Sequence, residues 1–313
     1  MPGQIPHRLA RRTLLAGLAG LGLGGAGLTA CAGTTATTAD SAASATTPPP
    51  GPRVVVLDTA ALDSAMTLGI TPVGAARAPA DTGLPDYWPA SRLAEITTVG
   101  EIGAPDTAVV RRLRPDLVLG NQVSDGAHYE TLRRVAPTLL TPAAAQVWKS
   151  NFLQHAQALD RRAAADAFTT AYQRHAAQVA QALAAAGLGG RRISLVRFAE
   201  NAPPRMYGRQ SFPGTLLTDV QLGRPDPQDT DQAEIDLPAD QIARADGDFI
   251  LYATYGDPVA SGATATLASP GWQALGAVRA HRAFPVDDRL WFQGVGYTGA
   301  NAVLDELQHL LGA

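Results

Sequence analysis

The chain has 313 residues, enough for one large domain or two ordinary ones, and 46% of them are apolar, which excludes a wholly disordered protein. Its formal net charge of −3 provides no basic field that would hold a nucleic-acid backbone. Its single cysteine, Cys31, excludes both an internal disulfide framework and a zinc site built from paired cysteines.

The first 30 residues are typical of an export signal, because a basic start without acidic residues precedes an apolar run at 13–30. The pair Arg11 and Arg12 resembles a twin-arginine signal, although general export remains open. The end of the run and Cys31 match a bacterial lipobox, in which the cysteine becomes the lipidated, palmitate-bearing first residue of the mature protein. The alternative is an uncleaved transmembrane anchor, since about 18 apolar residues are near the lower limit for a span.

Residues 31–52 form the next segment, which has no large apolar side chain after Cys31 and ends among prolines. Such a segment cannot bury enough surface to offset the entropy of ordering it, so we expect a flexible tether. A lipid, a tether and a globular body together predict a protein anchored at the outer, extracytoplasmic face of the cell membrane.

Short apolar runs alternate with helical segments from residue 53 onward. Strands that are rich in leucine or β-branched residues and separated by helices favour a mainly parallel sheet covered on both faces. We therefore expect an N-terminal α/β lobe over 53–150. Its expected strands are 53–58, 72–75, 116–120 and 138–141, and its expected helices are 62–68 and 109–113.

An alanine-rich stretch over 151–187 lacks proline, and lacks glycine until Gly187, which predicts one long bridging helix with a dip at 160–162. The alternation then resumes over 188–313, the predicted C-terminal lobe. We therefore expect an α/β protein with two Rossmann-like lobes joined by one long helix. The expected elements of the second lobe are strands at 193–198, 249–253 and 283–287 and helices at 213–221 and 301–311.

Several short segments follow one another along the body in an order that is specific to a known family. They are 53–58, 68–74, 99–100, 113–118, 148–152, 196–198, 205–208, 252–257 and 291–296. In this order the chain resembles the iron-siderophore substrate-binding lipoproteins of ABC transporters. The resemblance implies a class III binding-protein fold that barely hinges, with the ligand in the cleft between the lobes. It also implies a ferric siderophore as ligand, an ABC permease as partner, and neither enzymatic activity nor a cofactor.

Arginines are the first candidates for ligand binding. A ferric siderophore is a bulky chelate, so its site needs aromatic faces and guanidinium groups that match anionic oxygens. Arg197 ends an apolar strand, where the ligand crevice of an open α/β sheet lies, but a structural ion pair is its alternative. Arg205 and Tyr207 alternate on an extended segment and face one side, and Arg209 is either a third charge or a solvated loop residue. Arginines favour an anionic chelate without excluding a neutral one.

Aromatic residues complete the candidate set, each with ordinary packing as its alternative. They are Trp148 before the long helix, Tyr255 at a strand end, Trp291 and Phe292 in the loop before the last helix, and Tyr87 and Trp88 in a proline-flanked loop. The six histidines are scattered without paired spacing, so no direct metal site is expected.

At the positions where the family is expected to contact the permease, this chain has different residues. Members of the family commonly present one glutamate on each lobe, and this chain has Ala108 and Thr218 at those places. Asp106 and Asp219 lie close by in the sequence but face other sides of their helices. A haem or corrinoid receptor of the same fold and a receptor-like scaffold without transport remain alternatives. The sequence identifies neither the siderophore nor the permease.

Overall fold

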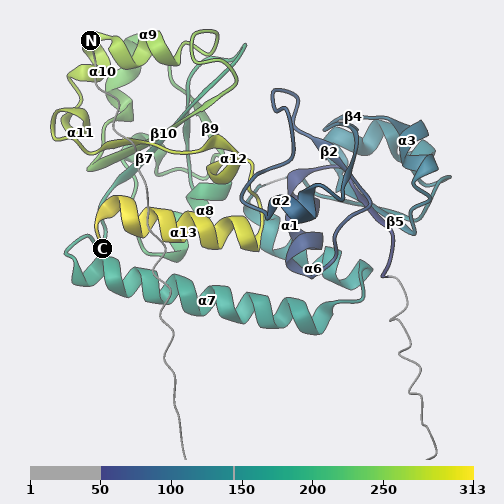
Figure 1. Ribbon diagram of the computed structural model, residues 1–313. Coiled ribbons are helices and arrows are strands. Elements are labelled where there is room, and N and C mark those ends of the chain that lie inside the picture. The colour runs from purple at the N-terminus through teal and green to yellow at the C-terminus, as the bar shows by residue number, and fades with distance from the viewer. Residues whose placement is uncertain (1–50, 144) are drawn as a thin grey trace, which may run out of the picture. The chain divides into compact units, whose positions relative to one another are not determined.

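The computed structural model describes residues 51–143 and 145–313 (Figure 1). The predicted signal and nearly all of the predicted tether, including Cys31, lie outside the described residues. Every helix within the described residues is too short or too polar to cross a bilayer.

The N-terminal lobe, as we call it, is built on a six-stranded sheet in the order β4-β3-β2-β1-β5-β6. Its neighbouring strands are parallel except for the antiparallel pair β3–β4. Asp58 and Asp106 begin α1 and α3 by accepting hydrogen bonds from backbone N–H groups of the first turn. Its elements are β1 Val54–Val56, α1 Thr59–Thr67, β2 Gly74–Arg77, α2 Ala90–Leu93, β3 Thr97–Glu101, β4 Ala104–Pro105, α3 Thr107–Arg112, β5 Leu117–Asn121, α4 Gln122–Asp125, α5 Tyr129–Leu132 and β6 Thr138–Thr141, with 3₁₀ turns at Gly126–His128 and Ala145–Val147.

The C-terminal lobe has a five-stranded sheet in the order β11-β10-β7-β8-β9. Strands β7, β10 and β11 pair in parallel, and β8 is antiparallel to both of its neighbours, β7 and β9. The two sheets with helices around them confirm the expected α/β class. The elements are β7 Ile193–Ala199, β8 Arg205–Tyr207, α8 Phe212–Asp219, β9 Glu234–Asp236, β10 Phe249–Tyr255, α9 Ala263–Ala268, α10 Pro270–Gln273, α11 Gly276–Arg279, β11 Ala283–Pro285, α12 Asp288–Trp291 and α13 Tyr297–Leu311, with 3₁₀ turns at Asp226–Gln228 and Ala239–Ala245.

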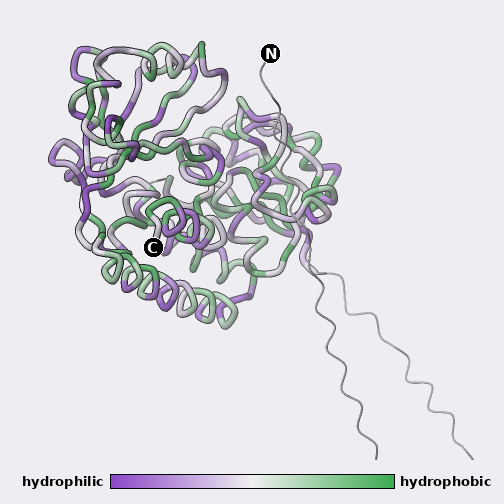
Figure 2. The backbone as a smooth tube through the Cα atoms, turned by 60° about the vertical axis from the view of Figure 1, so that its left-hand side comes forward, coloured by the Kyte–Doolittle hydropathy of each residue, from purple (hydrophilic) through white to green (hydrophobic). Residues whose placement is uncertain are grey.

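The segment between the lobes is two helices, α6 Trp148–Ala158 and α7 Arg162–Ala185, rather than the single helix that we expected. They separate at the predicted dip, because Asp160 takes a left-handed conformation with φ of 53°. Hydrophobic and hydrophilic residues alternate along α7 (Figure 2), and its buried side chains occur at helical spacing. Phe168, on the same helix, is 40% exposed.

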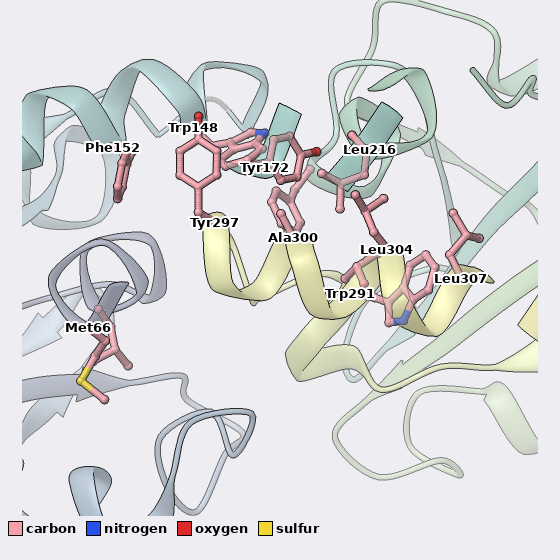
Figure 3. Packing of buried hydrophobic residues seen from close by; sticks show 14 of the residues in the cluster. Met66, Trp148, Phe152, Tyr172, Leu216, Trp291, Tyr297, Ala300, Leu304 and Leu307 are labelled. Atoms are coloured by element: carbon pink, nitrogen blue, oxygen red, sulfur yellow. The ribbon is translucent and has the colours of Figure 1, made fainter. Parts of the chain in front are cut away.

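One continuous hydrophobic cluster extends through both lobes. Helix α13 lies alongside α7 (Figure 1), and α1 contacts both α6 and α13. At this junction Tyr297 packs edge-on against Trp148, Phe152 and Tyr172, with ring centroids 4.8, 4.6 and 5.3 Å away (Figure 3). A large hydrophobic junction of this kind opposes movement of one lobe against the other.

A buried carboxylate also connects the lobes. Asp63 of α1 accepts hydrogen bonds from the backbone N–H groups of Thr298 and Gly299, at 3.2 and 3.0 Å, at the start of α13. The hydroxyls of Thr67 and Tyr87 also donate to it. Free N–H groups at a helix N-terminus favour a negative charge. Burial nevertheless raises the pKa of Asp63 to about 6, because its desolvation outweighs these hydrogen bonds.

This raised pKa predicts a pH-dependent stability. The folded protein holds the proton of Asp63 up to about pH 6, whereas the ordinary pKa of the group is 3.8. Lowering the pH from 7 to 5 should therefore add about 1 kcal/mol to the free energy of unfolding of the wild type relative to Asp63→Asn. Urea unfolding of both proteins at both pH values measures this difference. An identical pH dependence in the two proteins would contradict the raised pKa.

Candidate functional site

Three cavities lie at the carboxyl ends of the central strands. The N-lobe cavity, of about 200 Å³, is lined by residues that follow β1, β5 and β6. The C-lobe cavity, of about 110 Å³, lies at the ends of β7 and β8 and the start of α8. Ala145 and Val295 line both cavities, so the two adjoin. This is the place where open α/β sheets hold ligands.

The N-lobe cavity is lined by uncharged polar groups, apolar side chains and one carboxylate. That carboxylate, Asp58, accepts hydrogen bonds from Ala61 N at 2.6 Å and from Asn121 Nδ2 at 3.0 Å. Asn151 Nδ2 donates to the carbonyl of Pro142 at 2.8 Å. These groups are held in place by the protein itself, so the cavity is preorganised.

The C-lobe cavity brings together three of the predicted residues, Arg197, Tyr207 and Phe292. The rings of Tyr207 and Phe292 lie 4.7 Å apart at an interplanar angle of 60°. The guanidinium of Arg197 lies 5.4 Å from the Phe292 ring centroid and 5.1 Å from that of Tyr255. Aromatic faces and a cation therefore meet at one place.

Arg197 also has the partner that its structural alternative requires. Its Nε and Nη2 donate to the two carboxylate oxygens of Asp288 at 2.5 and 2.8 Å, and the two side chains are only 19% and 5% exposed. Burial lowers the pKa of Arg197, but the hydrogen bonds and charge of Asp288 outweigh this and leave the pKa raised. Asp288 is not among the candidate residues that the sequence pattern singled out. Its only signal is its position just after the last strand.

The third cavity, of about 360 Å³, is the acidic cavity, which lies between Ala80–Asp81 of the N-terminal lobe and strand-end residues of the C-terminal lobe. Tyr255 lines it, and the Tyr255 hydroxyl accepts a hydrogen bond from Ala80 N at 2.8 Å. Asp81 and Arg289 form an ion pair at 3.1 Å. The two lobes therefore touch across this part of the cleft. Its carboxylates are Asp81, Glu200, Asp257, Asp287 and Asp288.

The other two predicted arginines do not line the three cavities. Arg205 forms an ion pair with Glu234, which lies on the neighbouring strand β9. Arg209 is held by Asp229 at 2.5 Å and Asp231 at 3.1 Å. Acidic residues of neighbouring segments thus occupy both guanidinium groups, and Glu234 itself lines the C-lobe cavity, so ligand contact by Arg205 and Arg209 stays a prediction.

The prediction for Trp291 is corrected as well. It is the last residue of α12, not a loop residue, and its side chain is fully buried. It lies beside Leu304 and Leu307 of α13 (Figure 3), and its Nε1 donates to Glu306 at 2.8 Å. Trp291 is thus a core residue that the described conformation keeps away from any ligand.

Trp148 lies between the N-lobe cavity and the hydrophobic core. It contributes to the lining of the N-lobe cavity, but it is 3% exposed and belongs to the aromatic junction between the lobes. Its Nε1 donates to Thr215 Oγ1 of α8 at 3.0 Å. Its main contacts are therefore structural.

The candidate aromatic residues Tyr87 and Trp88 pack instead against the core and line none of the three cavities. The Tyr87 hydroxyl donates to buried Asp63 at 3.2 Å. Trp88 is 9% exposed, and the guanidinium of Arg92 lies 5.5 Å from its ring centroid. Their proline-flanked loop folds back onto the lobe, which corrects this prediction.

Comparison with known proteins gives consistent matches. The sequence profile of a family described as periplasmic binding protein matches residues 54–290. The probable siderophore-binding lipoprotein YfiY of Bacillus subtilis is 28% identical over 267 residues, which cover 82% of this chain and 81% of that protein. The achromobactin-binding periplasmic protein of Dickeya dadantii is 26% identical over 278 residues, 83% and 86% of the two chains. The crystal structure of Staphylococcus aureus SirA superposes with a TM-score of 0.72 at 25% identity, covering 83% of this chain and 98% of SirA.

The burial of Trp291 predicts a structural role. Trp291→Ala should lower the free energy of unfolding by about 3–5 kcal/mol, because it removes a fully buried indole. Urea denaturation measures the loss, and Phe168→Ala, which truncates a 40% exposed ring, is the control. A loss below about 1 kcal/mol for Trp291→Ala would show that the side chain is not packed in the core.

Proposed function

Since the chain belongs to the periplasmic binding protein family, we propose that it captures a ferric siderophore outside the cytoplasm and delivers it to an ABC permease. Members of this family bind solutes and are not enzymes, so the protein itself carries out no reaction. Relatives that align over more than four-fifths of this chain are named for siderophore or achromobactin binding, which supports the ligand class.

The observation that carries the proposal is the lining of the C-lobe cavity. Tyr207 and Phe292 present aromatic surface, and Arg197 brings a guanidinium to the same place. Aromatic faces provide contact area for a bulky chelate, and the N–H groups around them fix its orientation. Because the N-lobe cavity adjoins at Ala145 and Val295, a chelate in the cleft contacts both lobes at once.

Binding in this cleft needs little rearrangement of the protein. The hydrophobic cluster and the Asp63 hydrogen bonds connect the lobes behind the cavities. The ligand therefore enters a site that is already formed, and this lowers the conformational cost of binding. The energy for transport comes from a separate ATPase that acts on the permease.

The proposed function also requires a surface that contacts the permease. Ala108 and Thr218 are exposed but carry no charge. Asp219 is held by Lys149 Nζ at 2.6 Å and by the Tyr172 hydroxyl at 2.6 Å, so its carboxylate is used inside the protein. Asp106 caps α3 and is exposed. We therefore expect any acidic docking contact to involve Asp106 rather than Asp219.

The predicted export signal places the body of the protein outside the cytoplasm. We propose that a lipid on Cys31 anchors it at the outer face of the membrane. A relative is named a lipoprotein, which supports this. The tether would then let the body reach a permease in the same membrane.

The binding proposal predicts a loss of affinity in Phe292→Ala. Removing a ring that lines the C-lobe cavity should weaken ferric-siderophore binding about tenfold. Tryptophan-fluorescence titration with a panel of ferric siderophores, haem and cobalamin measures the affinities, and Phe168→Ala is the matched control on exposed α7. Tight binding of haem or cobalamin alone, or unchanged affinity in Phe292→Ala, would refute the assignment.

The anchoring proposal predicts that Cys31→Ala releases the protein. Without the thiol no lipid is attached, so the variant should move from the membrane pellet to the soluble fraction after cell fractionation. Thr34→Ala, in the same segment, should stay with the membrane. Retention of Cys31→Ala in the pellet would instead support an uncleaved apolar anchor.

A further inference from the structure

The three cavities together carry an excess of acidic groups. Among the described residues that line them, seven are carboxylates and two are guanidinium groups, with no lysine or histidine. Five of the seven carboxylates line the acidic cavity, so the part of the cleft beside the Arg197–Asp288 pair is electronegative.

Both guanidinium groups are already used by the protein. Arg197 is held by Asp288 through two hydrogen bonds, and Arg289 is bonded to Asp81 at 3.1 Å, with Asp86 at 3.6 Å. Neither arginine offers an anionic ligand a guanidinium free of a carboxylate partner.

Among the described residues, four of the lining carboxylates form no ion pair within 4.0 Å; they are Asp58, Glu200, Asp257 and Asp287. Their hydrogen bonds come from neutral N–H groups, such as Asp257 N to Glu200 at 2.6 Å and Arg289 N to Asp287 at 2.9 Å. Three of the four line the acidic cavity. Their negative charge faces whatever occupies the cleft.

An anionic ligand would meet two costs in this site. To make a two-pronged contact with Nε and Nη2 of Arg197 it must displace Asp288, which leaves a carboxylate that is 5% exposed without its partner; at Nη1 it meets a cation whose charge Asp288 already balances. It must also approach the unpaired carboxylates at short range, where like charges repel. A ligand without net negative charge avoids both costs and still gains the aromatic contacts of Tyr207 and Phe292.

We propose that the cleft selects ferric siderophores that carry no net negative charge, and that Asp288 sets this selectivity by occupying Arg197. The inference rests on the proposed function. It points to hydroxamate chelates, because three singly anionic hydroxamates neutralise Fe³⁺, whereas catecholates and carboxylates leave negative charge on the complex. A cationic group on such a ligand is favoured beside the acidic cavity.

A charge series on one chelate tests the selectivity of the wild type. Ferrioxamine B carries an ammonium group, its N-acetyl derivative is neutral, and its N-succinyl derivative is anionic, while the iron centre stays the same. Fluorescence titration should show that the anionic form binds at least tenfold more weakly than the neutral one and that the cationic form binds at least as tightly. The gap should narrow in 0.5 M NaCl, because salt screens these charges.

The outcomes separate the inference from the proposed function. Equal or tighter binding of the anionic form would overturn the inference while the function stands. The inference would also be overturned, with the function still standing, if ferric catecholates or ferric citrate bind and no member of the hydroxamate series does. If no ferric siderophore binds at all, the proposed function itself fails.

Asp288→Asn tests the role of the selecting residue. The amide keeps the shape of the side chain but frees Arg197, so affinity for the N-succinyl form should rise about tenfold, while affinity for the neutral form changes less than twofold. Asp305→Asn removes the same charge from an exposed site on α13 and should change neither affinity. Unchanged affinity for the N-succinyl form in a variant that still binds the neutral form would overturn the role of Asp288. If Asp288→Asn does not fold, the wild-type charge series decides the selectivity alone.

Discussion

Edge-to-face packing of aromatic rings where the two lobes meet fixes the distance between the two sheets. Tyr297 of α13 lies among Trp148, Phe152 and Tyr172, so the last helix of the chain is bound to the helices that connect the lobes. The strand ends on the far side of this junction cannot separate without opening the hydrophobic cluster. The geometry of the cleft, and hence the contacts available to a ligand, depend on this packing.

Charge pairing then decides what the fixed cleft can hold. Arg197 lies at the strand end that the fold offers to ligands, but the first residue of α12 in the same lobe, Asp288, forms an ion pair with it. Such a pair has little net charge, so it contributes shape and hydrogen-bond direction more than attraction for anions. Chains of one fold can therefore differ in ligand by one acidic residue beside a guanidinium.

The sequence predicted the order of lobes and the position of Arg197, because strand patterns and strand ends follow from local periodicity. It could not predict the partner of Arg197, since Asp288 is 91 residues away and comes from another segment. Trp291 and Phe292 show a second limit. These neighbours lie at the end of α12, where one step along the helix turns one ring into the core and leaves the other at a cavity. The sequence did predict a dip at Asp160, where the structure has a break, because charged residues interrupt an alanine-rich stretch there.

The stiff junction has a consequence for any optical sensor made from this protein. A pair of dyes on the two lobes would report almost no change in separation when cargo arrives. A single environment-sensitive dye at the mouth of the cleft suits the molecule better, and Val259, 74% exposed and two residues from Asp257, provides such a place. Because Cys31 is the only native cysteine, a body produced without its leader would carry one thiol after Val259→Cys, and labelling would be uniform.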